Sequence, residues 1–138
     1  MEKLIIILGN TCTGKSLLGK KLESQYGIPY ISFGDLKRNE IKSKSKLGVR
    51  LISKIDKNMP IDPVDGLALI SKSIPSKCQV ANSISGYPIS EEEYTPLALM
   101  YNIVLGIHLQ TEEQIMRERF FHRGICPVCN FPGILNDK

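Results

Sequence analysis

The residues with the clearest chemical potential form a glycine-rich loop near the start of the chain. This segment reads Gly9-Asn10-Thr11-Cys12-Thr13-Gly14-Lys15-Ser16. The spacing is that of a phosphate-binding loop (P-loop), in which glycines let successive backbone N–H groups point at a phosphate. Lys15 is expected to reach the β- and γ-phosphates of a nucleoside triphosphate, and the Ser16 hydroxyl to ligate Mg²⁺. We expect Cys12 to contribute its backbone N–H rather than thiol chemistry.

The segments on either side of the loop supply the context that this motif requires. The apolar run Leu4–Leu8 predicts a strand buried on both faces of a parallel sheet. Lys15 to about Tyr26 predicts a helix, which Gly27 and Pro29 bring to an end. Because the loop joins a buried type of strand to a helix, binding of phosphate explains it better than a chance glycine-lysine turn.

The rest of the chain alternates between predicted strands and helices. The predicted strands span 29–32, 79–84 and 103–109, and the predicted helices span 35–57 (with a break near 46–48), 62–75 and 111–122. Asp62 and Pro63 form a helix start, and Thr111 opens a segment with the character of a capping box. The alternation predicts one α/β domain over residues 1–138, with a parallel sheet of about four strands flanked by helices.

Basic residues concentrate between Lys37 and Lys57, where eight of them stand against Glu40 and Asp56. Five of the basic residues recur at every fourth position, namely Arg38, Lys42, Lys46, Arg50 and Lys54. This spacing predicts that they follow one side of a helix, for which a solvated surface is the simplest interpretation. No aromatic residue lies among them to stack on bases, which argues against nucleic acid. A small phosphorylated substrate remains an alternative.

Composition and cysteine usage restrict the class of protein. The chain has 42% apolar residues, a net charge of +4 and four cysteines. Its Leu4–Leu8 run is too short for a membrane span or a signal peptide, so we expect a cytoplasmic protein with no membrane partner. The cysteines do not suggest the framework of a secreted disulfide protein.

Segments beyond the loop resemble the adenylate kinase and nucleoside monophosphate kinase family. The matching segments are Tyr26–Arg38, Ser45–Gly48, Met59–Asp62, Gly86–Pro88 and Arg119–Arg123, followed by Cys126-Pro-Val-Cys129. They occur in the family's order along nearly the whole chain. The Asn-Lys-x-Asp and Asp-x-x-Gly signatures of GTPases are missing, and no predicted strand ends in the Asp of a usual Walker B motif.

The resemblance implies ATP- and Mg²⁺-dependent phosphoryl transfer to a nucleoside monophosphate. Lys15 and the loop amides would hold the ATP phosphates, while Asp35 would hold a water on Mg²⁺ and Gly86 would belong to the same nucleotide site. Residues 33–75 would bind the acceptor, with Arg38 on its phosphate and the backbone around Ile61 against its base. Arg119 would lie against the ATP base, and Arg123 would contact phosphates at the transfer site. This division of labour suits phosphoryl transfer, which depends mainly on positioning and on neutralisation of charge.

Four positions depart from the family pattern. The signature Asp-Gly-Phe-Pro-Arg stands here as Ser85-Gly86-Tyr87-Pro88-Ile89, so a carboxylate and a guanidinium are replaced. Glu93 stands where the family usually has a Gln that reads adenine, and Phe33 replaces a small hydroxyl residue. Two alternatives therefore stay open. One is a catalytically weakened nucleotide-binding relative with a binding or regulatory role, and the other is a P-loop kinase for a different small acceptor.

The end of the chain resembles part of the family's lid, over residues 120–138. Cys126 and Cys129 match the first half of a zinc site that some members have, but a closed structural site needs four ligands. Only Asp137 and His122 are available nearby, so we expect no complete zinc site within one chain. The second half of the lid, the last strand and the closing helix are absent. The chain is therefore expected to be a natural short form, a fragment, or a subunit completed by a partner chain.

Overall fold

The computed structural model describes residues 1–75, 80–125, 128 and 132–134. In chain order the elements are β1 (Lys3–Leu8), α1 (Lys15–Tyr26), β2 (Tyr30–Ser32), α2 (Phe33–Lys42), α3 (Lys46–Asp56), α4 (Pro63–Ser73), β3 (Asn82–Ser85), α5 (Glu91–Met100), β4 (Asn102–His108), α6 (Glu113–Phe121), β5 (Arg123–Ile125) and β6 (Pro132–Ile134). The predicted α/β class is confirmed.

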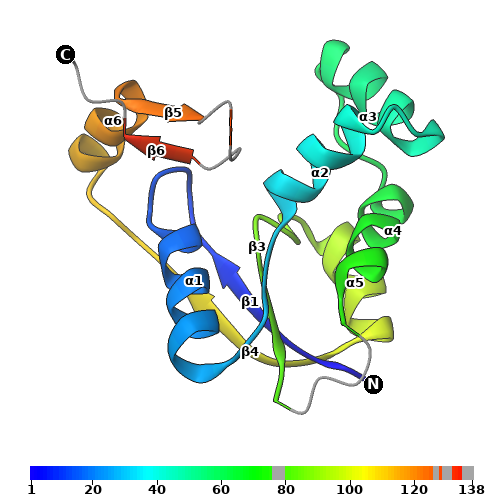
Figure 1. Ribbon diagram of the computed structural model, residues 1–138, viewed down its shortest axis with the longest axis horizontal. Helices are drawn as coiled ribbons and strands as arrows, with labels where there is room; N and C mark the ends of the chain where they lie inside the picture. Colours follow the sequence, from blue (N-terminus) through cyan, green and yellow to red (C-terminus); the bar gives the residue numbers. More distant parts are fainter. Residues whose placement is uncertain (76–79, 126–127, 129–131, 135–138) are drawn as a thin grey trace.

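Four parallel strands form the main sheet in the order β2-β3-β1-β4 (Figure 1). The strands point the same way, so their carboxyl ends line up along one edge of the sheet. The segments that lead from β1 to α1, from β2 to α2, from β3 to α5 and from β4 to α6 all begin at that edge. An edge of this kind is where open parallel sheets bind their ligands.

The central strand β1 is apolar because both of its faces are covered. Residues Leu4 to Ile7 are all buried, as the continuous apolar run predicts. Leu4 and Ile6 belong to a core cluster that also includes Leu47 of α3, Leu69 of α4 and Leu97 of α5. The buried strand therefore holds the start of the glycine-rich loop on a rigid support.

The region between Asp35 and Lys57 differs from the single helix suggested by its charge spacing. Two helices, α2 and α3, are separated by residues 43–45, close to the predicted break. The Ser45 hydroxyl accepts a hydrogen bond from the Gly48 N–H at 2.9 Å and so caps α3. Added to Gly48, a Cβ would lie 2.3 Å from the Glu40 carbonyl oxygen, so this glycine lets the two helices approach closely.

The prediction that five basic residues follow one side of a helix is therefore wrong. Arg38 and Lys42 belong to α2, whereas Lys46, Arg50 and Lys54 belong to α3. The turn between these helices breaks the four-residue spacing, which is meaningful only within a continuous helix. Arg50 is also engaged elsewhere, since its guanidinium donates to the Asp65 carboxylate of α4 at 2.6 and 3.3 Å.

Helices α5 and α6 also differ from the prediction. Helix α5 is not among the predicted helices, and Pro96 within it removes a helical N–H. The Ser90 cap, whose hydroxyl accepts from the Glu93 N–H at 3.4 Å, and an acidic first turn favour the helix nonetheless. The capping box expected at Thr111 is wrong, because α6 begins at Glu113 with Glu112 as N-cap and no side-chain cap bond.

The remaining boundaries agree with the sequence to within a few residues. Gly27, in a left-handed conformation, ends α1, and its N–H bonds to the Glu23 carbonyl at 3.0 Å. Asp62 caps α4 with Pro63 at its start, as predicted. Strand β3 lies at Asn82–Ser85, slightly later than the predicted 79–84, of which residue 79 is outside the described part. None of the helices described is both long and apolar enough to cross a membrane.

Two groups of elements stand above the carboxyl edge of the sheet. At the top of Figure 1, α6 and the antiparallel hairpin β5–β6 lie on the left, and α2 and α3 lie on the right. The glycine-rich loop lies at the base of the left-hand group, between β1 and α1. A ligand held by this loop would therefore lie beneath α6 and face α2 across the edge of the sheet.

Candidate nucleotide-binding site

The glycine-rich loop adopts a backbone conformation that only certain residues allow. Gly9, Cys12 and Gly14 have φ angles of 144°, 64° and 96°. A Cβ on Gly9 would lie 2.6 Å from the Leu109 carbonyl oxygen, so both its φ and its surroundings require glycine. Left-handed residues interspersed in a loop turn successive N–H groups towards a common point, which makes a concavity for anions.

Lys15 is held by the loop itself. Its ammonium group donates to the carbonyl oxygens of Gly9 at 2.7 Å and of Asn10 at 2.5 Å. The Thr13 hydroxyl donates to the same Asn10 carbonyl at 2.8 Å. Burial lowers the pKa of Lys15, the nearby charge of Arg123 lowers it further, and Cys12 partly opposes these effects. An anion beside Lys15 would relieve the repulsion between these two cations.

Arg119 and Arg123 meet the loop at one residue. The Arg119 guanidinium donates to the Cys12 carbonyl oxygen at 3.1 Å, and that of Arg123 donates to the Cys12 sulfur at 3.9 Å. Both arginines are exposed and stand at the end of α6 and the start of β5. The structure thus brings Lys15 and two arginines more than 100 positions later in the sequence around one turn of backbone.

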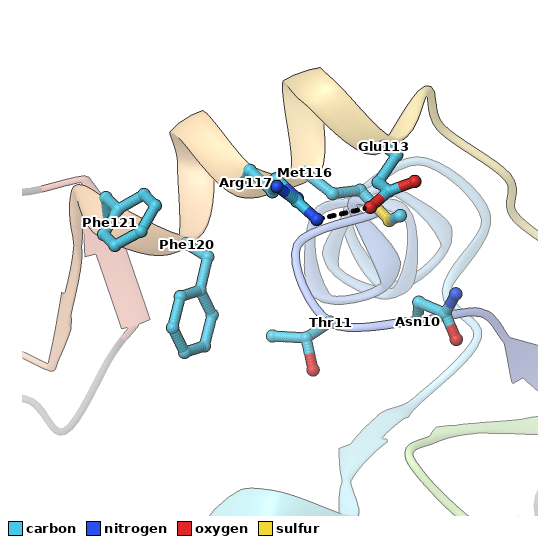
Figure 2. A pocket seen from close by; sticks show the side chains of 7 residues that line it. All are labelled: Asn10, Thr11, Glu113, Met116, Arg117, Phe120 and Phe121. Atoms are coloured by element: carbon cyan, nitrogen blue, oxygen red, sulfur yellow. Dashed lines mark ion pairs between the residues drawn. The ribbon is translucent and has the colours of Figure 1, made fainter.

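A cavity of about 450 Å³ lies between the loop and α6 (Figure 2). It is lined by Asn10, Thr11, Glu113, Met116, Arg117, Phe120 and Phe121. Figure 2 shows the Phe120 ring on the side of α6 that faces Thr11, and Arg117 paired with Glu113 at 2.8 Å. An exposed aromatic ring and a thioether beside a phosphate loop offer apolar surface on which a flat ring could pack.

Ser16 on α1 accepts a hydrogen bond from Tyr30, which is in turn bonded to Ser85. The Tyr30 hydroxyl on β2 donates to the Ser16 Oγ at 3.2 Å, and it lies 2.6 Å from the Ser85 Oγ at the end of β3. Ser85 is buried, whereas Ser16 is only partly buried. The sequence prediction included Ser16 and noted Ser85, but it did not identify Tyr30. No local sequence pattern indicates this role of Tyr30, because its partners Ser16 and Ser85 are brought to it by the tertiary fold.

Across the edge of the sheet, Asp35 and Arg38 form an ion pair on α2. Asp35 was predicted to hold a water on Mg²⁺ and Arg38 to hold an acceptor phosphate, and here each neutralises the other. The Arg38 Nε is buried and has no hydrogen-bond partner among the residues that the structure describes. Since a buried donor without a partner is costly, a movement of the Arg38 side chain that let this N–H reach an anion would be favourable.

Aromatic packing forms the floor beside this ion pair. The Phe33 and Tyr87 rings lie 4.6 Å apart between centroids, and the Lys37 ammonium lies 5.4 Å from the Phe33 centroid. Burial lowers the pKa of Lys37, with a further lowering from Arg38 and an opposing effect from Glu93. Burial, followed by the Glu93 charge, raises the pKa of Tyr87 to about 12.

The two remaining departures from the family pattern have different surroundings. Ile89 is 82% exposed, so its side chain supports nothing in the described structure. Glu93 is buried, and its carboxylate accepts a hydrogen bond from the Ile89 N–H at 2.7 Å. Gly86, between Ser85 and Tyr87, has a φ of 79° and lets the chain turn past Phe33.

The proposed metal ligands fall into two sets. Ser16 lies in the first turn of α1, directly after the glycine-rich loop. Cys126 and Cys129, the predicted half of a zinc site, lie outside the described residues. Within the described part of the chain, no group of three or more His, Cys, Asp or Glu residues could hold a metal. A Mg²⁺ ion at Ser16 would therefore take its other ligands from phosphate and water, as Mg²⁺ bound with nucleotides commonly does.

Comparison with known proteins gives a consistent set of relatives. The adenylate kinase of Thermosipho melanesiensis is 33% identical over 132 residues, which cover 91% of this chain and 61% of that protein. The adenylate kinase of Thermococcus gammatolerans is also 33% identical, with 91% and 58% covered. That of Bacillus subtilis is 26% identical, with 91% and 60% covered. The chain spans about three fifths of the length of these relatives, and no family model matches it.

Proposed function

We propose, from the premise that this chain is a homologue of adenylate kinases along 91% of its length, that it binds ATP with Mg²⁺ and phosphorylates a nucleoside monophosphate. The observation that carries the proposal is the meeting of Lys15, Arg119 and Arg123 around the anion-binding turn at Cys12. Three cations at one concave turn suit a triphosphate, whose charge must be neutralised when a phosphoryl group is transferred.

The residues of the donor side fit this ligand. The loop amides and the N-terminus of α1 would bind the β- and γ-phosphates, with Lys15 leaving the Gly9 and Asn10 carbonyls to join them. Ser16 would supply one oxygen to Mg²⁺, which shields the charge between the two phosphates. The cavity under α6 is adjacent to the loop, and we assign it to the nucleoside part of ATP.

The residues of the acceptor side fit a smaller anion. The unpartnered N–H of Arg38 would donate to the phosphate of the monophosphate, and Lys37 would add charge beside it. Phe33 and Tyr87 are almost completely buried beside these cations, so they would support the acceptor site from below and leave contact with the acceptor to Arg38 and Lys37. An oxygen of the acceptor phosphate would attack the γ-phosphorus, and the bond from the γ-phosphorus to the β,γ-bridging oxygen would break. The products would be two diphosphates.

A second candidate, a nucleotide-binding protein with little catalytic activity, also has a specific observation in its favour. Where the family has a carboxylate and a guanidinium, this chain has Ser85, engaged with Tyr30, and Ile89, which is exposed. Arg38 is moreover paired with Asp35. Fewer free charges face the acceptor than in the family pattern, so transfer could be slow while binding of ATP persists.

The test measures formation of diphosphates by the purified chain. The protein is incubated with ATP, Mg²⁺ and each nucleoside monophosphate in turn, and diphosphates are separated and quantified by chromatography. We expect a diphosphate of the acceptor nucleoside that is absent without enzyme and absent with Lys15→Ala. Calorimetry with ATP accompanies the assay. Binding of ATP without diphosphate supports the second candidate, and no binding of ATP rejects both.

A further inference from the structure

A chain of three hydroxyl groups links the two sides of the candidate site. Ser16 belongs to the first turn of α1, Tyr30 to β2 and Ser85 to the end of β3. The Tyr30 oxygen lies 3.2 Å from the Ser16 Oγ and 2.6 Å from the Ser85 Oγ, so it is the centre of the chain. Of the three groups, only Ser16 is part of the phosphate-loop motif.

The Tyr30 ring is fixed, so its hydroxyl has little freedom. A Cβ on Gly19 would lie 2.1 Å from the ring, which shows that Tyr30 packs directly on the backbone of α1. The backbone of Tyr30 is held as well, since β2 pairs with β3 opposite Ser83 and the Tyr30 N–H donates to the Glu23 carboxylate at 3.3 Å. A tyrosine held at both ends can hold a partner in one geometry at small entropic cost.

The hydrogen bonds among these three hydroxyl groups can point in one of two directions, because each hydroxyl has a single proton. Each hydroxyl has one proton and can accept from others, so Tyr30 can donate to only one of its two neighbours. When Tyr30 donates to Ser16, Ser85 donates to Tyr30. With a divalent cation bound, the Ser16 hydroxyl would be more acidic and would act as a donor. Tyr30 then accepts this proton's hydrogen bond and donates to Ser85, and all three groups remain satisfied.

We propose that Tyr30 is a positioning residue for Mg²⁺, which orients the Ser16 hydroxyl for the metal and accepts its hydrogen bond when the metal is bound. Ser85 holds Tyr30 in this role. The inference rests on the proposed function, because it takes Ser16 as a ligand of Mg²⁺ that enters with ATP. It gives Ser85 a task that needs a hydroxyl and not a carboxylate.

The experiment removes the hydroxyl and keeps the ring. Tyr30→Phe retains the packing on Gly19 and loses both hydrogen bonds. Binding of ATP is measured by calorimetry with Mg²⁺ and again with EDTA, for this variant and for the parent. We expect Kd for ATP with Mg²⁺ to rise about three- to tenfold, the usual effect of one lost hydrogen bond, and Kd in EDTA to stay within about twofold.

Two further variants make the result specific. Tyr26→Phe removes the hydroxyl of an exposed tyrosine at the end of α1 and should change neither constant. Ser85→Ala removes the support of Tyr30 and should weaken binding in the same sense by a smaller factor, again only with Mg²⁺. If Tyr30→Phe fails to fold, as thermal unfolding would show, Ser85→Ala carries the same test.

The outcomes separate this inference from the function on which it rests. An equal loss of affinity with Mg²⁺ and with EDTA would show a purely structural role and overturn the inference. An unchanged Mg²⁺ dependence in Tyr30→Phe, or in Ser85→Ala where that variant stands in for it, would also overturn it, while the parent's binding of ATP left the proposed function standing. Failure of the parent to bind ATP would instead reject the proposed function, and the inference would fall with it.

Discussion

The donor and acceptor sides of the candidate site differ in what holds them in place. On the donor side, three left-handed residues shape the loop, and Lys15, Arg119 and Arg123 bind to its backbone carbonyls or to Cys12. On the acceptor side, Arg38 is held by the Asp35 side chain, and aromatic side chains form the floor. A site formed by backbone groups requires glycine wherever its conformation excludes a Cβ. A site formed by side chains can change its contacts one substitution at a time.

This difference explains where the chain departs from the family pattern. The loop keeps each residue that its backbone requires, including Gly9, at which a Cβ would collide with the Leu109 carbonyl. The departures at Phe33, Ser85, Ile89 and Glu93 all lie on side chains at the ends of β2 and β3 or at the start of α5. Under the proposed function, these departures would alter recognition of the acceptor and support of Mg²⁺ more than binding of the donor phosphates.

The largest effect is expected on the donor side. Lys15→Ala removes the cation nearest the loop and should reduce transfer by about 10²–10³, the usual loss for one well-placed charged group. Calorimetry should also show weaker binding of ATP, with thermal unfolding unchanged. Lys21→Ala, which removes an exposed lysine from the same helix, is the matched control. Equal effects of the two variants would contradict the assignment of residues 9–16.

A smaller effect, confined to the acceptor, is expected from Arg38→Ala. Loss of a charge-assisted hydrogen bond should raise KM for the monophosphate about ten- to a hundredfold and leave KM for ATP nearly unchanged. The exposed Lys42 on the same helix provides the control variant Lys42→Ala. If KM for the two substrates rises equally, the separation into two sides is wrong.

Asp35→Asn separates two roles for its carboxylate. If Asp35 only holds Arg38, the variant frees the guanidinium, and KM for the acceptor should stay the same or fall. If Asp35 holds a water on Mg²⁺, kcat should fall and more Mg²⁺ should be needed for half-maximal activity. The ion pair favours the first result. The measurement is initial rate against Mg²⁺ and against acceptor concentration.

The sequence predicts the donor side better than the acceptor side, for a physical reason. The loop, β1 and α1 depend on residues close together in the chain, so glycine spacing and an apolar run suffice to identify them. The acceptor side depends on contacts between distant residues. Tyr30 meets Ser85 from 55 positions away, and Phe33 at the start of α2 packs on Tyr87, which follows β3.

The helices show the same limit of local patterns. The spacing of basic residues suggested one helix surface, but Ser45 and Gly48 favour a turn that separates α2 from α3. Helix α5 is missing from the predicted elements, although it has a side-chain cap at Ser90 and buries Leu97 in the core. In both regions a single capping residue helps to fix where a helix begins, and a pattern read over many residues does not reveal it.

A further effect, on stability, is expected where Tyr30 packs on α1. Gly19→Ala would place a Cβ 2.1 Å from the Tyr30 ring and should destabilise the protein by about 1–3 kcal/mol, as overpacking usually does. Gly106→Ala on β4 is the control, because no atom lies within 4 Å of its Cβ position. Chemical denaturation measures both. Equal stability of the two variants would mean that Tyr30 can move away without cost.

The smallest expected effect is an increase in the rate of phosphoryl transfer. It tests the comparison of the donor and acceptor sides most directly. Ile89→Arg adds a guanidinium at an 82% exposed position, where it needs no burial, and should lower KM for the acceptor. Ser85→Asp places a carboxylate beside the Tyr30 hydroxyl in a buried position, so part of its benefit to Mg²⁺ is offset by desolvation. We expect the double variant to transfer phosphate less than about tenfold faster than the parent, well below the 10²–10³ of an optimally placed group.

The single variants show which side limits the reaction. Ile89→Arg alone should change KM for the acceptor, and Ser85→Asp alone should change the dependence on Mg²⁺. This pair of results would show that the two sides act independently. The rates are measured as diphosphate formed at saturating ATP. Brisk transfer by the parent with no gain in the double variant would mean that the site has already accommodated both residues, and the weakly catalytic alternative would be rejected. The hydroxyl chain through Tyr30 predicts that this accommodation is more complete at Ser85 than at Ile89, because Ser85 has a partner and the exposed Ile89 side chain supports nothing in the described structure.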